Sequence, residues 1–226
     1  MAERYVLKFS KGGYAKYTSH LDLLRFFKRA FRKTGIDLRY SQGFNPHPKL
    51  GFAQPLSLGY SGAEELLEFE TDTYNEPEKI MELLKPEMPE GLEIKQCDHL
   101  DLKVKSLAGE AESADYTVMI PFEISREELE SIILAYLDQD EIKALKRRKK
   151  DKKMIETDIK KQIRKLEGTA LEKMICLNMQ LDCGSISNCS PELVISSFCR
   201  FAELDIPRYS IDVERKKIRF YNNLQI

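Results

Sequence analysis

The chain has 226 residues, of which 42% are hydrophobic and 32% are charged, and its formal net charge at pH 7 is −1. This composition is typical of a globular protein and excludes a wholly disordered chain. No window offers the roughly 18 uninterrupted apolar residues of a membrane span. The first residues also lack the apolar core of a secretory signal, so we expect a cytoplasmic protein.

The first hundred residues predict the element order β-α-β-β-α-β. Residues 4–11 alternate apolar and polar side chains, as a half-buried strand does. Ser19 and Asp22 form a capping-box pattern, which predicts a helix that ends at Gly35. A second, short helix is expected from Pro77. Further extended segments are expected at 36–41, 49–60, 64–72 and 91–100.

The second half can be interpreted in the same way. A helix capped by Ser125 is followed by a lysine-rich stretch, 141–159, that could be a hairpin arm or an exposed helix. Another helix is expected at 190–202, and strands are expected at 115–123, 170–183 and 209–221. We therefore predict an α+β fold of two ferredoxin-like βαββαβ units in tandem, each an antiparallel sheet with helices on one face.

The predicted domain boundaries follow from this order. Residues 1–100 would form the N-terminal unit and residues 115–226 the C-terminal unit, joined by a linker at 101–114.

Charge is unevenly distributed along the chain. Residues 4–50 hold 11 Lys and Arg against 2 Asp and Glu, a net charge of +9. Residues 51–140 hold 6 against 22, a net charge of −16, and residues 141–173 hold 13 against 6, a net charge of +7. Such blocks indicate at least one face suited to an anionic partner.

The cysteines and histidines give no metal-site pattern. The five cysteines include no C-x-x-C pair and no C-x₃-C-x₂-C triplet. Cys183 and Cys189 could form half of a metal site, but the histidines at 20, 47 and 99 supply no matching pair. We therefore expect reduced, buried thiols and no metal. Walker and G-x-G-x-x-G motifs are absent from the sequence as well.

The stretch SQGFNPHP, residues 41–48, predicts a stiff loop. Gly43 can adopt a positive φ, Asn45 can form an Asx-turn, and the two prolines fix φ near −65°. The loop would present Asn45 and His47. If it folds back over the start of the first helix, His20, Ser41, Asn45, His47 and Lys49 converge. The alternative is a rigid corner that serves packing alone.

The first helix has a basic face that could be a phosphate-binding patch or only a solvated surface. The candidate binding residues of the helix and the loop are His20, Arg25, Lys28, Arg29, Arg32, Ser41, Gly43, Asn45, His47 and Lys49. A second basic cluster lies at 146–153. Aromatic residues that suit base stacking are Tyr14, Tyr17, Phe26, Tyr40 and Phe44, although Phe26 fits the core better.

Two motifs carry a resemblance to a known family. Residues 19–23, SHLDL, and 41–48, SQGFNPHP, together with PLSLG at 55–59 and the acidic pair at 64–65, resemble the radical SAM-linked protein family. This is a bacterial domain of unknown function encoded beside, or fused to, radical SAM proteins. The resemblance implies an accessory of a radical SAM enzyme that acts on RNA or ribosome-associated substrates. The [4Fe–4S] cluster and S-adenosylmethionine would belong only to that partner, because this chain has no cysteine triplet and we expect it to hold no cofactor.

Three functions remain open at this point. The first is a non-catalytic module that binds RNA, or presents an RNA substrate, through the basic helix and the loop. The second is an RNA-processing endonuclease in which His20 or His47 acts as acid or base, with Tyr14 as a further candidate. The third is a protein–protein adaptor that binds no RNA.

Overall fold

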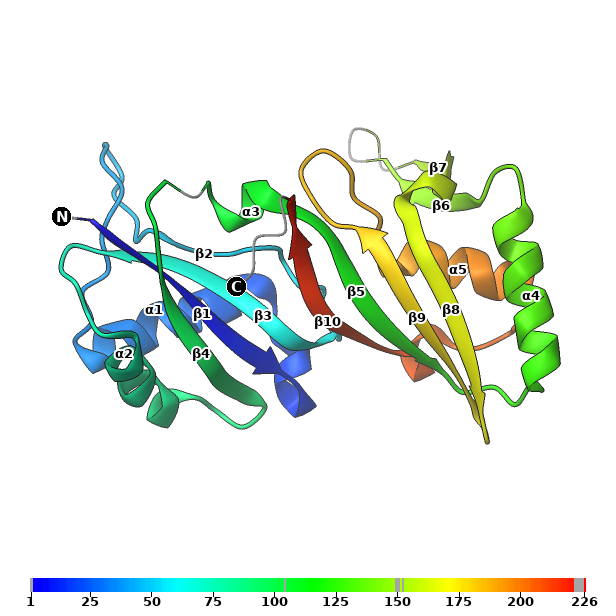
Figure 1. The fold of residues 1–226 in the computed structure, drawn as a ribbon, viewed down its shortest axis with the longest axis horizontal. Helices are drawn as coiled ribbons and strands as arrows, with labels where there is room; N and C mark the ends of the chain where they lie inside the picture. Colours follow the sequence, from blue (N-terminus) through cyan, green and yellow to red (C-terminus); the bar gives the residue numbers. More distant parts are fainter. Residues whose placement is uncertain (1, 104, 149–150, 152, 222–225) are drawn as a thin grey trace. The chain divides into compact units, whose positions relative to one another are not determined.

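The computed structural model describes residues 2–103, 105–148, 151, 153–221 and 226 (Figure 1). The chain has an α+β fold whose paired strands are mostly antiparallel. It divides into two compact units, the first formed by residues 1–111 and 217–226 and the second by residues 112–216. None of the helices in the described part of the chain has the length and apolar composition needed to cross a bilayer.

The first unit follows the predicted order of elements. Its elements are β1 (Glu3–Lys11), the 3₁₀ helix η1 (Gly13–Tyr17), α1 (His20–Thr34), β2 (Leu50–Phe52), β3 (Ser61–Thr71), α2 (Pro77–Leu84), the 3₁₀ turn η2 (Lys85–Glu87), β4 (Leu92–Leu100) and α3 (Leu107–Glu110). Strand β1 lies between β4 and β3 and is antiparallel to both. Strand β2 pairs with β3, opposing Leu50 to Phe69 and Phe52 to Leu67.

Local sequence signals determine both ends of α1. The Ser19 side chain accepts a hydrogen bond from the Asp22 N–H, and Gly35 ends the helix with a φ of 75°. Glycine adopts this left-handed conformation without a Cβ clash. The buried face packs against β1 and β3 and consists of Leu23, Phe27, Ala30 and Phe31. The capping-box prediction of this helix is confirmed.

The two faces of the first sheet carry separate apolar clusters. Tyr5, Leu7 and Phe9 of β1 join the larger cluster, which α1 and α2 cover. The side chain between the first two, Val6, points to the opposite face and joins a smaller cluster. That cluster also takes in Leu107 of α3 and two residues from the end of the chain, Ile218 and Phe220. Residues 101–114, predicted to be a linker, thus contain α3 and the start of the next strand.

The second unit also combines paired strands with helices. Its elements are β5 (Ala111–Ile120), α4 (Arg126–Asp138), β6 (Lys143–Arg147), β7 (Met154–Asp158), the 3₁₀ turn η3 (Lys160–Gln162), β8 (Ile163–Leu171), β9 (Met174–Asp182), α5 (Pro191–Phe201), the 3₁₀ turn η4 (Arg208–Ser210) and β10 (Asp212–Phe220). Strand β9 lies between β5 and β8. The last residues of β10 belong to the first unit.

The lysine-rich stretch is a hairpin. Strands β6 and β7 pair in a two-stranded sheet of their own, with Lys143 opposite Asp158 and Arg147 opposite Met154. The hairpin prediction for 141–159 is therefore confirmed, and the exposed-helix alternative is wrong. Residues 149, 150 and 152 of the second basic cluster lie outside the described residues.

Candidate functional site

The loop at residues 40–49 projects from the first unit immediately before β2 (Figure 1, light blue). Hydrogen bonds close its base: the Ser41 N–H donates to the His47 carbonyl at 2.9 Å, and the Lys49 N–H donates to the Arg39 carbonyl at 2.8 Å. Tyr40 also forms a β-bridge with Pro48. The loop therefore has a closed hydrogen-bonded neck in addition to the turn residues on which the prediction of stiffness rests.

Ser41 and His47 form a polar pair inside the loop. The His47 N–H donates to Ser41 Oγ at 3.1 Å, and the same oxygen lies 3.0 Å from His47 Nδ1. The Asn45 carbonyl lies 3.4 Å from Nδ1. When the Ser41 hydroxyl donates to Nδ1, the proton of the neutral imidazole is on Nε2. Because the His47 side chain is exposed, Nε2 is then a hydrogen-bond donor available to a ligand.

The tip of the loop is aromatic. Gly43 has a φ of 139°, which a residue with a Cβ rarely adopts, and Phe44 follows it with a fully exposed side chain. Of the other aromatic candidates, Tyr14, Tyr17 and Tyr40 are also exposed, whereas Phe26 packs against the core as predicted.

The structure does not bring His20 to the loop. As the first residue of α1, His20 packs its ring on Phe52 with 5.2 Å between the ring centroids. The loop instead follows the other end of this 15-residue helix, which at 1.5 Å per residue is about 22 Å long. Within the described part of the chain, hydrogen-bonding contacts bring together Ser41, Asn45 and His47, whereas the ring of His20 lies against Phe52.

His20 has an unusual electrostatic environment of its own. Burial, and then the nearby Lys11, lower the pKa of His20, which favours the neutral ring. Lys11 is almost fully buried and donates from Nζ to the Thr18 carbonyl at 2.9 Å. His20 therefore acts in the structure as a packed, neutral side chain at the start of α1.

Strand pairing cancels much of the charge separation seen along the sequence. Several cations of the first basic block form ion pairs with acids of the block at 51–140. These pairs are Arg4–Glu68 at 2.8 Å, Lys33–Glu87 at 2.6 Å, Lys49–Glu70 at 2.8 Å and Arg39–Asp72 at 3.6 Å. The candidate residue Lys49 is thus neutralised by Glu70 on the neighbouring strand.

Three cations of α1 have no ion pair among the described residues. The side chains of Lys28, Arg29 and Arg32 form no hydrogen bond or ion pair with any described residue, although Arg29 is near enough to Asp22 to help lower the pKa of that carboxyl, and Arg29 and Arg32 are exposed. Arg25, on the same side of the helix, pairs with Asp22 at 3.0 Å, but both side chains are exposed and such pairs are weak. We call Arg25, Lys28, Arg29 and Arg32 the α1 cation row.

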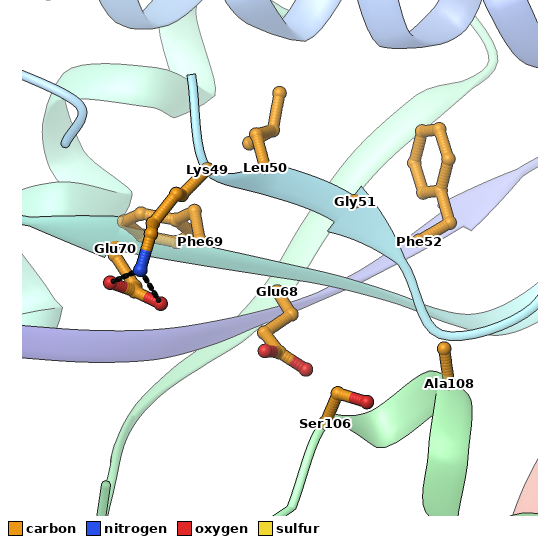
Figure 2. Close-up of a pocket in the computed structure, with 9 residues that line it drawn as sticks. All are labelled: Lys49, Leu50, Gly51, Phe52, Glu68, Phe69, Glu70, Ser106 and Ala108. Atoms are coloured by element: carbon orange, nitrogen blue, oxygen red, sulfur yellow. Dashed lines mark hydrogen bonds and ion pairs between the residues drawn. The ribbon is translucent and has the colours of Figure 1, made fainter. Parts of the chain in front are cut away.

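A hollow of about 220 Å³ lies along β2 and β3, as Figure 2 shows. Gly51, Glu68 and Ser106 line it, and the Lys49–Glu70 ion pair borders it. The Glu68 carboxylate is already used, because it accepts from Arg4 Nε and from the Leu107 N–H, each at 2.8 Å. The volume is below the roughly 300 Å³ of ordinary ligand sites. We interpret the hollow as part of the attachment of α3.

No metal centre or reactive thiol stands out. Within the described ranges, no three His, Cys, Asp or Glu side chains come together as metal ligands. The five cysteines are free. Burial raises the pKa of Cys97 and of Cys189 to about 12, so these thiols stay protonated at neutral pH.

Comparison with known families identifies the family to which the chain belongs. Residues 4–191 match the family described as "Uncharacterized protein conserved in bacteria (DUF2344)". The chain belongs to this bacterial family. None of the curated proteins matches it. The link of the motifs to radical SAM proteins stays a prediction.

Solved structures add information on the fold alone. A chain in the "Crystal Structure of a Cbf5-Nop10-Gar1 Complex" is similar to 95% of this chain, with a TM-score of 0.50 and 9% identity. The match spans 48% of that chain, so the protein covers about half of its structural neighbour. An "Unknown Protein from Galdieria sulphuraria" aligns over 96% of this chain and 98% of its own, with 8% identity and a TM-score of 0.27, too low to support an argument.

Proposed function

We propose that this protein is a non-catalytic RNA-binding module that works as an accessory of a radical SAM system. RNA binding is supported mainly by three side chains of the α1 cation row that form no ion pair with the described residues. Four other cations of the same basic block form ion pairs with acids on other elements, whereas the side chains of Lys28, Arg29 and Arg32 form none with the described residues. Cations held together without acidic partners repel one another and are stabilised by an anionic ligand.

Phosphate is the ligand chemistry that fits a row on a helix face. Arg29 and Arg32 are three residues apart and therefore lie on the same side of α1. Each phosphate contact releases counterions, and this lowers the slope of log K against log salt by about 0.7 for single strands or 0.9 for duplexes. A surface with three such contacts is expected to give a slope of roughly −2 to −3.

The loop would add a second contact to the same ligand. With the Ser41 hydroxyl donating to Nδ1, His47 Nε2 offers a hydrogen-bond donor, and Phe44 offers an exposed ring on the closed neck. Rigid aromatic and hydrogen-bonding groups on loops are typical of binding surfaces, because little conformational entropy is lost on binding.

The finer fold assignment belongs to the same proposal. In the first unit, β4, β1, β3 and β2 follow one another through their pairings, and α1 and α2 share one apolar cluster. This order supports a ferredoxin-like unit. In the second unit, the neighbours β5, β9 and β8 are compatible with a repeat of that unit.

The radical SAM partner is proposed from the resemblance of residues 19–23 and 41–48 to the radical SAM-linked family. Any cluster and S-adenosylmethionine would be held by that partner. Affinity purification of the tagged full chain, followed by mass spectrometry and iron analysis, tests this part. Recovery of an iron–sulfur protein supports it, and its absence from cells that express the radical SAM protein contradicts it.

RNA binding is tested by charge reversal. The intact protein and the variant Lys28→Glu/Arg29→Glu/Arg32→Glu are titrated into labelled tRNA and rRNA fragments at about 50 and 200 mM salt. We expect salt-sensitive binding by the intact protein and its loss in the variant. Absence of binding by the intact protein at both salt concentrations would contradict RNA binding and favour the adaptor function.

A matched control separates local contacts from net charge. The variant Lys79→Glu/Lys95→Glu/Lys103→Glu makes the same change in charge at three exposed cations of the first unit, outside α1. It should bind RNA with nearly the affinity of the intact protein. Equal losses in the two variants would mean that only overall charge matters.

A hydrolytic role is the second candidate, and one observation favours it. Ser41 Oγ lies 3.0 Å from His47 Nδ1, within reach for proton transfer. If the loop cleaves RNA, His47→Ala abolishes cleavage and leaves binding within a few-fold of the intact protein. RNA that remains intact after long incubation with the native protein would exclude this role.

A further inference from the structure

The 3₁₀ helix η1 presents two tyrosines to solvent. Tyr14 is 87% exposed and Tyr17 is 63% exposed, although η1 has only five residues. Large aromatic side chains usually bury most of their surface, so two exposed rings in one short turn indicate a contact surface.

Hydrogen bonds hold the backbone of η1 just before Tyr14 and between the two tyrosines. The Gly12 N–H donates to the Gly91 carbonyl at 2.8 Å, and the Gly59 N–H donates to the Lys16 carbonyl at 2.9 Å. Ala15, between the two tyrosines, is buried. A Cβ at Gly91 would lie 2.4 Å from the Gly12 carbonyl oxygen, so glycine is needed for this close approach. The rings are thus held outward by an anchored turn.

The two exposed tyrosines lie shortly before the α1 cation row in the chain. Helix α1 begins three residues after η1 ends. Its exposed side then runs through Arg25, Arg29 and Arg32 toward the end that leads to the loop. Lys16 lies 5.4 Å from the centre of the Tyr17 ring and adds a cation beside it. From Arg25 to Arg32 the α1 cation row extends about 10 Å along the helix, and the two exposed rings lie shortly before the helix in the chain.

We propose that η1 and the α1 cation row bind a single-stranded segment of RNA, with unpaired bases stacked on Tyr14 and Tyr17 and phosphates on the cations. This inference rests on the proposed RNA-binding function and specifies its ligand. In a duplex the bases are stacked on one another and their faces are hidden, so exposed rings add nothing to its binding. Stacking on aromatic side chains is typical of proteins that bind single strands without reading sequence.

The test compares two RNAs by fluorescence anisotropy with the full chain. One is an unstructured oligonucleotide of about 12 nucleotides, and the other is a blunt duplex of the same length. In the variant Tyr14→Ser/Tyr17→Ser we expect a loss of at least about fivefold per ring for the single strand. We expect no loss for the duplex and an unchanged salt slope for both RNAs, because no cation is removed.

Two controls distinguish stacking from damage to the fold. Tyr14→Phe/Tyr17→Phe keeps both rings and should bind the single strand like the intact protein. Tyr209→Ser removes a tyrosine that is 91% exposed in the second unit and should have no effect.

The outcomes separate this inference from the function on which it rests. If the tyrosine variant binds the single strand as tightly as the intact protein, or loses the duplex equally, the inference is overturned. The RNA-binding function still stands in that case, provided that charge reversal of the α1 cation row abolishes binding. If the intact protein binds neither RNA, both fail, and the exposed tyrosines would then be a protein-docking surface.

Discussion

Removal of the Glu68 carboxylate should destabilise the first unit more than any surface charge change. Glu68 accepts from Arg4 Nε and from the Leu107 N–H, each at 2.8 Å. The Arg4 side chain is only 7% exposed, and Leu107 is fully buried. In Glu68→Ala the guanidinium keeps its bond to the Lys105 carbonyl at 2.8 Å but loses its carboxylate, and the Leu107 N–H loses its acceptor.

The expected magnitude follows from these two losses. Breaking one side of a buried ion pair costs about 3–5 kcal/mol, and a buried unsatisfied N–H costs about 1–3 kcal/mol. The Glu68 side chain is 20% exposed and Arg4 keeps its bond to the Lys105 carbonyl, so we expect the low end of this range, about 3 kcal/mol in total. For a chain of this size that is a fall in Tm of roughly 6–12 °C.

Urea unfolding followed by circular dichroism measures this change. Glu93→Ala, on the exposed side of β4, makes the same chemical change and should lie within about 0.5 kcal/mol of the intact protein. The double variant Arg4→Met/Glu68→Met should recover much of the loss, because it leaves no unpaired buried charge. A cost below about 1 kcal/mol for Glu68→Ala would refute this reasoning.

Three further changes have expected outcomes. Glu70→Gln removes the carboxylate that neutralises Lys49, and this should tighten RNA binding and steepen the salt slope by up to about 0.7–0.9 in anisotropy titrations. Gly62→Ala places a Cβ 2.5 Å from Oε1 of the buried Glu65, which should cost about 1–3 kcal/mol in urea unfolding. Ser19→Ala removes the N-cap of α1 and should cost about 1 kcal/mol in the same assay.

Each of these predictions has a measurable result that would contradict it. Unchanged or weaker binding by Glu70→Gln would mean that Lys49 does not contact RNA, and wild-type stability of Gly62→Ala would mean that Glu65 has room to move. The effect of Ser19→Ala should also depend on pH. The hydrogen bond from Ser19, and then Arg25, lower the pKa of Asp22. The ionised Asp22 carboxylate therefore stabilises the fold at neutral pH, and this stabilisation is lost as the pH falls through the lowered pKa. The gap between the two proteins should therefore narrow in acid.

Local chemistry explains what the sequence predicted correctly. The cap at Ser19 and the glycine at 35 act within one turn of α1, so their residue types suffice to locate the helix. The positive φ of Gly43 was expected in the same way from its residue type. Strand β8 was not predicted, because Lys165 and Gly168 interrupt its apolar pattern and its pairing with β9 is a tertiary fact.

Which residues of the candidate site are available for binding depends on tertiary contacts, and sequence patterns do not show these contacts. The sequence does not show which cations of the basic block are paired. In the structure, strand pairing brings Glu68 and Glu70 beside Arg4 and Lys49. Only the structure distinguishes the cations that pair with acids on other elements from the α1 cation row. The sequence also did not show that the His20 ring packs against Phe52, which is a tertiary contact.

Photo-crosslinking tests the central claim, that RNA lies on η1 and α1, most directly. A single-stranded RNA bound to the full chain is irradiated, the protein is digested, and the crosslinked peptides are identified by mass spectrometry. The account predicts crosslinks in peptides that cover residues 13–33, with additional ones at 40–49. Crosslinks confined to the basic hairpin at 143–158, or scattered evenly over both units, would contradict it.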